Sequence, residues 1–288
     1  MDSQKQYPRV YSFEFFPPKT EKGIQNLSRT RDTLSGLKPR FFSVTFGAGG
    51  STQDRTFETV ADIQSKCDIE VAPHLSCIGS TRENIRQILQ TYQSSGIHHI
   101  VALRGDMPSG MGEAGDFIHA NELVEFIRSE TGDHFHIEVA AYPEYHPQAQ
   151  NPDQDLENFI RKARSGANSA ITQYFYNPYA YFRFVGRCEQ AGLDIAVVPG
   201  IMPITNSSQL ARFSDACGAE IPRWIRKRLE GFGDDIASIR AFGEDVVTEL
   251  CQALLDNGAP GLHFYTMNRA EPSMAIWKNL GISSGTGP

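Results

Sequence analysis

The stretch SSGIHHIVALRGD, Ser94 to Asp106, contains the junction that decides the fold. A helical pattern of apolar residues precedes it, and Gly96 follows where that pattern ends. Glycine just past a helix end can take the left-handed conformation that a Cβ atom disfavours. The apolar run that comes next, 97–103, is typical of a buried strand, and Arg104 and Asp106 follow it at once. We therefore interpret the stretch as a helix end, a buried strand and a polar strand end.

The same junction recurs along the chain and predicts its architecture. Residues 65–77 repeat it without a glycine, and an opening strand lies near residues 10–16. About eight strands that alternate with helices favour parallel pairing and a single (β/α)8 TIM barrel. A doubly wound open sheet is the alternative, and residues 206–257 predict extra helices between strands seven and eight. The other junction glycines are Gly36, Gly132, Gly166, Gly192 and Gly258.

Length and composition limit the function classes. The chain has 288 residues, of which 40% are hydrophobic, which allows one large domain or two small ones, and no linker divides residues 1–288, so we expect a single domain with short tails. A formal charge of −7 argues against a nucleic-acid partner. Neither a signal peptide nor an apolar run of roughly 18 residues is found, so no membrane partner is expected. The five cysteines form no C-x-x-C pair, which indicates a reducing cytoplasm.

Polar residues follow nearly every predicted strand. In parallel barrels the active site is built at the carboxyl ends of the strands, so these residues predict a catalytic mouth. They are Glu14, Thr45, His74, Arg104, Asp106, Tyr142, His146, Gln173 and Arg269.

The segment YSFEFFPPK, Tyr11 to Lys19, places one carboxylate, Glu14, among phenylalanines and prolines. Such a group is either a buried ion-pair partner, of Arg104 or Arg269, or an acid whose pKa is raised by apolar walls. His74 has two readings as well, as a site residue or as a satisfied core histidine. We interpret the remaining strand and junction histidines as structural, and no histidine pair has the helical spacing of a metal site, so no metal is expected. These histidines are His98, His99, His134, His136 and His263.

The predicted helix NPDQDLENFIRKARSG, residues 151–166, follows the fifth strand. Asp155, Asn158 and Lys162 share one face of it, and Arg161 lies beside them. Charges on a helix face are usually only solvated, but this face begins at the predicted mouth, where a pair of cations could hold a diphosphate. The glycine-rich stretch FGAGGS, 46–51, does not match a dinucleotide-binding pattern and is equally explained as a turn.

Eight short segments, in order, resemble the motifs of bacterial methylenetetrahydrofolate reductase, over residues 9–281. The resemblance implies a TIM barrel that binds FAD and uses NADH or NADPH to reduce 5,10-methylenetetrahydrofolate, in ping-pong fashion, for methionine synthesis. Its implied partners are a folate substrate and further copies of the chain in a homo-oligomer. The resemblance further implies that residues 1–288 are one catalytic domain without a regulatory domain, because the chain is too short to contain the one that eukaryotic members carry. The segments are FEFFPPK, SVTFGAGGS, APHL, HIVALRGD, AAYPEYHP, ITQYF, PGIMPI and HFYTMNRAE.

The resemblance also implies residue roles. Glu14 is expected to be the general acid, and Asp106 is expected to stabilise positive charge on the folate. The implied folate contacts are Asp106, Gln173, Gln209, Phe213 and Arg269, and Thr45 and Gln173 fall on nicotinamide contacts. The implied FAD contacts are Thr45, Phe46, Ala48, His74, Arg104, Gly105, Asp106, Ala120, Tyr142, His146, Ala149, Asp155, Asn158, Arg161 and Lys162. A flavin-free lyase or methyltransferase and a non-catalytic flavin or folate binder are the competing classes.

Overall fold

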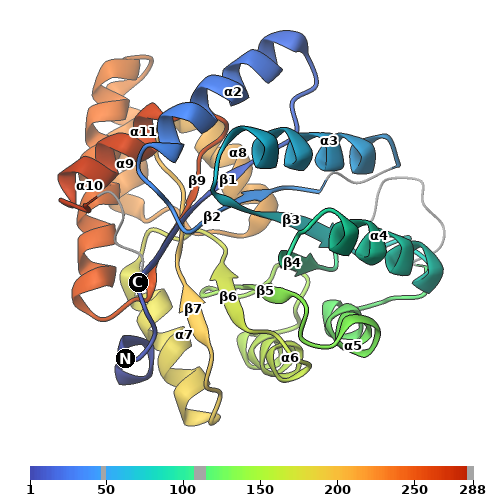
Figure 1. Cartoon of the computed structure of the whole chain (residues 1–288). Coiled ribbons are helices and arrows are strands. Elements are labelled where there is room, and N and C mark those ends of the chain that lie inside the picture. Colours follow the sequence, from blue (N-terminus) through green and yellow to red (C-terminus); the bar gives the residue numbers. More distant parts are fainter. Residues whose placement is uncertain (47–49, 107–114, 284–288) are drawn as a thin grey trace.

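Nine parallel strands form the centre of the computed structural model, and helices surround them (Figure 1). The structure describes residues 1–46, 50–106 and 115–283, except for the side chains of residues 50–53. The strands are β1 (Val10–Phe15), β2 (Phe41–Val44), β3 (Glu70–Ser76), β4 (His99–Leu103), β5 (His136–Ala141), β6 (Ser169–Thr172), β7 (Ala196–Val198), β8 (Gly200–Ile201) and β9 (Gly261–Tyr265). Their order, β7-β6-β5-β4-β3-β2-β1-β9-β8, is that of a nearly closed barrel and confirms the predicted TIM-barrel class.

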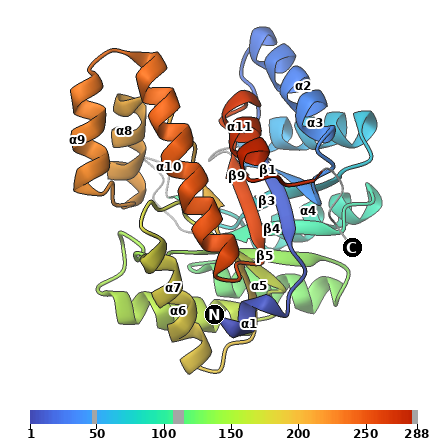
Figure 2. The ribbon, with the colours of Figure 1, turned by 90° about the vertical axis from the view of Figure 1, so that its left-hand side faces the viewer.

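Between α1 (Asp2–Lys5), which precedes β1, and the last helix, the helices lie between successive strands, as the junction pattern predicts. The first of these are α2 (Glu21–Ser35), α3 (Gly50–Lys66), α4 (Arg82–Ser94), α5 (Ala120–Thr131), α6 (Pro152–Arg164) and α7 (Pro178–Gln190). The predicted extra helices are α8 (Ser207–Cys217), α9 (Arg223–Phe232) and α10 (Ile236–Asp256), and α11 (Glu271–Asn279) follows β9. Figure 2 shows α8 and α9 side by side next to the long helix α10. No described helix has both the length and the apolar character needed to cross a membrane.

The predicted seventh strand is divided at Pro199, which explains why nine strands are present rather than about eight. Proline has no backbone N–H group and cannot donate to a neighbouring strand. The Pro199 carbonyl instead accepts a hydrogen bond from the His263 N–H group at 3.0 Å. As a result β7 pairs with β6 while β8, one residue further on, pairs with β9, and this single segment joins the two ends of the sheet.

The junction glycines behave largely as the sequence predicts. Gly96, Gly192 and Gly258 have φ angles of 70°, 66° and 95°, in the left-handed region that glycine tolerates. Gly36 is the exception, because its φ is −62° and the left-handed residue of that junction is Lys38, with φ 53°. The expected role of Gly36 is therefore wrong, although the junction itself is present.

Strand alternation divides the apolar residues into two layers. Phe13, Phe15 and Phe264 point outward and pack between the strands and the helices, with the Phe13 and Phe264 ring centroids 5.3 Å apart. A smaller cluster fills the barrel interior and consists of Phe41, Ala72, Val101 and Ile171. The Phe41 ring lies 4.3 Å from the His99 ring and 5.9 Å from the His263 ring, between centroids. This interior cluster separates the two ends of the barrel.

Candidate active site

Two adjoining cavities open at the carboxyl ends of the strands. The central cavity, of about 530 Å³, is lined by Glu14, Thr45, His74, Gln173 and Phe213 among others. The lateral cavity, of about 340 Å³, lies against α6. The two share part of their walls, so groups bound in them would touch each other. The shared residues are Leu103, Asp106, Ala140, Tyr142, His146 and Gln148.

Glu14 lies at the end of β1 and faces the barrel interior, as does Ser12 two residues earlier. Its Oε2 atom is 3.3 Å from Nε2 of His74 and 3.7 Å from Nε2 of His263. The other ring nitrogen of His263, Nδ1, is 2.7 Å from the Ser12 hydroxyl. One carboxylate thus meets two imidazoles, and one of these is held in place by a serine.

The pKa of Glu14 differs in direction from the prediction. Burial acts to raise the pKa, but the contacts with His263 and His74 outweigh it and lower the pKa from 4.5 to about 2. Of the phenylalanines expected to surround it, Phe13 and Phe15 point to the opposite face of the strand, while Phe16 lines the central cavity together with Glu14. The carboxyl group is therefore an ionised group paired with histidine.

The alternative that Glu14 pairs with Arg104 or Arg269 is also wrong. The Arg104 guanidinium donates to the side-chain oxygen of Gln148 at 2.5 Å and lines the lateral cavity. Arg269 is exposed and lines neither cavity. His263 was interpreted as structural and was missed as a neighbour of Glu14. Its position two residues before Tyr265, on a strand whose side chains alternate, places it on the interior face.

The predicted face of α6 forms one wall of the lateral cavity. Asp155, Asn158, Arg161 and Lys162 all line it, so the helical spacing located them correctly. Asn151 fixes the start of the helix, because its side-chain oxygen accepts from the N–H groups of Asp153 and Gln154. The cap thus fixes where α6 begins, and the residues that follow on this face, from Asp155 to Lys162, line the lateral cavity.

Lys162 is the half-buried cation of this wall. Its Nζ donates to the Ala140 carbonyl oxygen at 2.5 Å, and burial lowers its pKa to about 8. Asp155 accepts a hydrogen bond from the His146 N–H group at 3.0 Å. With Arg104 and Arg161 also present, cations outnumber carboxylates along this wall, which is the charge balance that an anionic group requires.

Gly105 allows close approach of the backbone between the cavities. Its φ is 84°, and a Cβ atom there would lie 1.9 Å from the Ser76 hydroxyl oxygen. Tyr142 and His146 stand beside it with ring centroids 4.6 Å apart, in an edge-on arrangement. These two rings offer an aromatic surface at the boundary of the two cavities.

Several predicted site residues occupy other places. Thr45 and His74 line the central cavity and not the lateral one, whereas Ala120 and Ala149 line the lateral one. Phe46, Gln209 and Arg269 line neither, although Gln209 belongs to α8, the same helix as Phe213. Ala48 lies outside the described residues.

The barrel and the polar cavities at its mouth define an enzyme of the (β/α)8 class. The comparison with family models is specific, because the model described as methylenetetrahydrofolate reductase matches residues 2–281. The chain therefore belongs to the methylenetetrahydrofolate reductase family and is an oxidoreductase.

Individual relatives agree with this placement. The 5,10-methylenetetrahydrofolate reductase of Escherichia coli K12 is 43% identical over 274 residues, which cover 95% of this chain and 91% of that protein. An Arabidopsis thaliana protein named methylenetetrahydrofolate reductase (NADH) 1 is 39% identical over 286 residues, covering 95% of this chain and 48% of that protein.

Solved structures confirm the fold. A Clostridium thermocellum protein, described as binding two copies of 5-methyl-5,6,7,8-tetrahydrofolic acid, superposes with a TM-score of 0.70 at 17% identity. The match covers 98% of this chain and 97% of that one.

Proposed function

We propose that the chain reduces 5,10-methylenetetrahydrofolate to 5-methyltetrahydrofolate, with FAD as bound carrier and NADH or NADPH as electron donor. The single observation that carries this proposal is the shared wall of the two cavities, formed by Asp106, Tyr142 and His146. A carrier in the lateral cavity and a substrate in the central cavity would meet at this wall. Family membership supplies the reaction, and the NADH in the names of plant relatives supports the donor.

The residues of the lateral cavity fit a dinucleotide. Arg161 and Lys162 would hold its diphosphate, while Tyr142 and His146 would contact its ring system. When bound, FAD supplies the capacity to take up a hydride from the nicotinamide and to pass it on to the folate. Because one central cavity adjoins this ring position, we propose that nicotinamide and folate occupy it in turn, which is ping-pong kinetics.

Glu14 is the residue that we propose delivers the proton. The methylene carbon of the substrate can accept a hydride only after its bond to N10 breaks, and the departing electron pair on N10 requires a proton. In the described site Glu14 is ionised, since its pKa is lowered to about 2. A pterin ring over the carboxylate would exclude water, which favours the neutral acid over the carboxylate. Glu14 would then take up a proton as substrate binds and pass it to N10.

Asp106 and two other residues would place the folate. Asp106 reaches both cavities, so its carboxylate can accept from the amino-pyrimidine edge of the pterin and stabilise positive charge near the reacting carbon. Gln173 offers an amide to the same ring, and Phe213 of α8 offers an apolar surface.

We further infer that residues 1–288 act as one catalytic unit and that copies of the chain assemble into a homo-oligomer. The five free thiols are compatible with a reducing cytoplasm, where we propose that the protein acts.

Anaerobic half-reactions test the proposal directly. The FAD-loaded protein is mixed with NADH, and the expected loss of the yellow flavin absorbance is followed; methylenetetrahydrofolate is then added and should restore it. A protein that takes up no FAD after refolding would favour a flavin-free lyase or methyltransferase. A yellow protein that NADH does not bleach would be a binder, and either result would overturn the proposal.

A further inference from the structure

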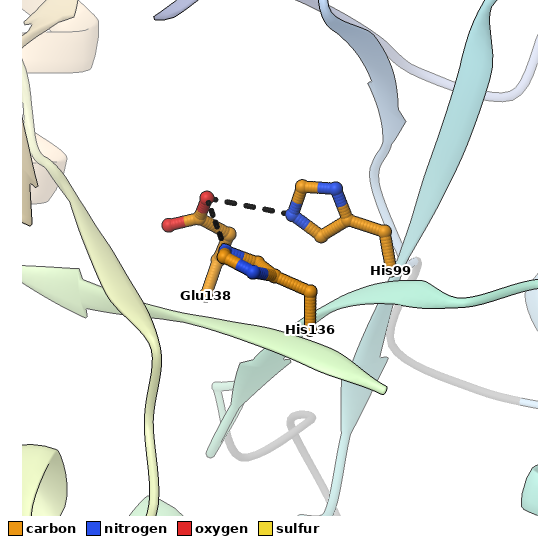
Figure 3. A group of neighbouring side chains, drawn as sticks. All are labelled: His99, His136 and Glu138. Carbon is orange, nitrogen blue, oxygen red and sulfur yellow. Dashed lines mark ion pairs between the residues drawn. The ribbon is translucent and has the colours of Figure 1, made fainter. Parts of the chain in front are cut away.

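A second group of titratable side chains lies at the opposite end of the barrel from the active site. His99 and His136 are the first residues of β4 and β5 and are paired in register, and Glu138 lies two residues along β5 on the same face. They border a cavity of about 200 Å³, which is lined by the first residue of each strand from β1 to β7. In Figure 3 one oxygen of the Glu138 carboxylate faces a ring nitrogen of both His99 and His136.

The spacing of these three side chains matches a tetrahedral metal site. Oε1 of Glu138 is 3.4 Å from Nε2 of His99 and 3.5 Å from Nε2 of His136, and the three potential ligand atoms lie within 4.8 Å of one another. Zinc binds imidazole nitrogen and carboxylate oxygen at about 2.0–2.2 Å, so tetrahedral angles place neighbouring ligand atoms roughly 3.3–3.5 Å apart. The two distances from Oε1 of Glu138, to Nε2 of His99 and to Nε2 of His136, fall in this range.

Two polar atoms of the cluster are buried and make no hydrogen bond within the part of the chain that the structure describes, namely Nε2 of His99 and Oε2 of Glu138. The contact of Nε2 of His99 is the 3.4 Å ion pair with Oε1 of Glu138. The side chains are only 5% and 4% exposed, so water compensates them poorly. A buried polar atom without a hydrogen bond destabilises the fold, and a metal ion bound to both residues would remove much of this cost.

A second carboxylate supports His99 from its other side. Oε2 of Glu70 lies 3.7 Å from Nδ1 of His99, and the Arg40 guanidinium lies 3.6 Å from the same oxygen. A carboxylate behind a metal-binding imidazole keeps the proton on the far nitrogen, which directs the lone pair of Nε2 towards the metal. Glu70 and Glu138 together also balance the two charges of a divalent cation.

From these observations we propose that His99, His136 and Glu138 bind one Zn²⁺ ion, with the fourth position open to water. His136 is 44% exposed, which gives the ion an entry path and leaves room for that water. The Ser169 hydroxyl, now 2.6 Å from Nε2 of His136, would have to release this nitrogen. The ion would join β4 to β5 far from the catalytic mouth and would stabilise the barrel without taking part in the reaction.

Zinc content measured on the FAD-bound protein tests the site. The affinity tag is removed, the protein is stripped with a chelator and dialysed against micromolar ZnCl₂, and bound zinc is measured by mass spectrometry. We expect about one zinc per wild-type chain and less than a tenth of that in Glu138→Gln and in His136→Asn. Glu70→Gln should bind roughly 10- to 100-fold more weakly, as other residues behind metal ligands do. His98→Gln, which changes an exposed histidine next to the cluster, should bind like the wild type.

Two further outcomes decide the proposal. Zinc at 100-fold above its dissociation constant should raise the melting temperature of the wild type by roughly 5–10 °C and leave that of His136→Asn unchanged. His136 is partly exposed, so its variant is expected to fold even if Glu138→Gln does not. A wild type that binds no zinc would overturn the proposal and leave the three side chains joined only by their ion pairs. Equal zinc in wild type and His136→Asn would place the ion elsewhere, for example at the mouth, and would overturn the site.

Discussion

His74 and His263 approach the same oxygen atom, Oε2 of Glu14, from β3 and β9, at 3.3 and 3.7 Å. Two imidazoles thus hold one carboxylate oxygen, and Ser12 fixes the ring orientation of only one of them. Substitution of Glu14 decides whether this carboxylate transfers a proton or serves only as an ion-pair partner.

The variant Glu14→Gln should separate the two half-reactions. Reduction of the flavin by NADH needs no acid, so its rate should stay within roughly tenfold of wild type, or about 1.4 kcal/mol in barrier. Reduction of methylenetetrahydrofolate needs a proton on N10 and should fall by about 10²–10⁴-fold. Stopped-flow measurement of each half-reaction checks both rates.

Glu144→Gln is the matched control for this experiment. Glu144 is also partly buried near the mouth, but its carboxylate accepts from the Glu220 N–H group and does not line the central cavity. Its variant should keep both half-reactions. If Glu14 were only a structural ion pair, Glu14→Gln would slow both half-reactions together and lower the melting temperature.

Acid should destabilise the wild type more than Glu14→Gln. The pKa of Glu14 is lowered from 4.5 to about 2 in the folded protein. The stabilisation is therefore complete above about pH 4.5 and is lost as the pH falls towards 2, with an upper limit of about 3 kcal/mol. Denaturant unfolding at several pH values across this range measures the difference between the two proteins, and parallel curves would contradict the pairing with histidine.

FAD retention should depend on Lys162. Lys162→Ala should weaken FAD binding roughly 10- to 100-fold, because a charged hydrogen bond contributes about 1.5–3 kcal/mol, and Arg161→Ala should act in the same direction. Binding should also weaken above the Lys162 pKa of about 8 in the wild type but not in Lys162→Ala, since only the protonated amine attracts a diphosphate. Flavin fluorescence during dilution gives the dissociation constants.

Arg164→Ala provides the control on the same helix. The Arg164 guanidinium donates to the Ala191 carbonyl oxygen and does not line the lateral cavity. FAD binding should be unchanged in this variant. Unchanged binding in both Lys162→Ala and Arg161→Ala would rule out α6 as the diphosphate site.

Asp106→Asn should affect redox tuning and folate binding together. A carboxylate at the boundary of the two cavities opposes the addition of electrons to a nearby flavin, so its removal should raise the flavin potential. Folate affinity should fall, because a charge-assisted contact becomes a neutral one. Spectroelectrochemistry and folate titration measure the two effects, and normal values of both would exclude Asp106 from the site.

Local sequence patterns predicted the features that depend on local geometry. Residues three and four apart on a helix share a face, which placed Asn158, Arg161 and Lys162 on one wall. The strand ends likewise placed Glu14, Asp106 and Gln173 at the central cavity.

Features that depend on register between distant strands could not be predicted. His263 meets Glu14 because β9 pairs with β1, a contact between residues nearly a whole chain apart. The pairing of His99 with His136 is a similar case, because neither helical histidine spacing nor cysteine spacing predicts two residues that meet only through the register of β4 and β5. Phe46 and Arg269 lie in loops, and Gln209 lies on α8, one of the extra helices. At these positions no helical or strand repeat in the sequence predicted whether the side chain faces the cavities.

The apolar cluster inside the barrel has an evolutionary consequence. Phe41 touches His99 on one side and His263 on the other, yet its ring carries no exchangeable proton. Together with Ala72, Val101 and Ile171 it separates the histidines beside Glu14 from the charged group at the far end. Substitutions at His99, His136 or Glu138 should therefore leave catalysis unchanged. This end of the barrel can then differ between lineages, while the residues of the mouth are conserved.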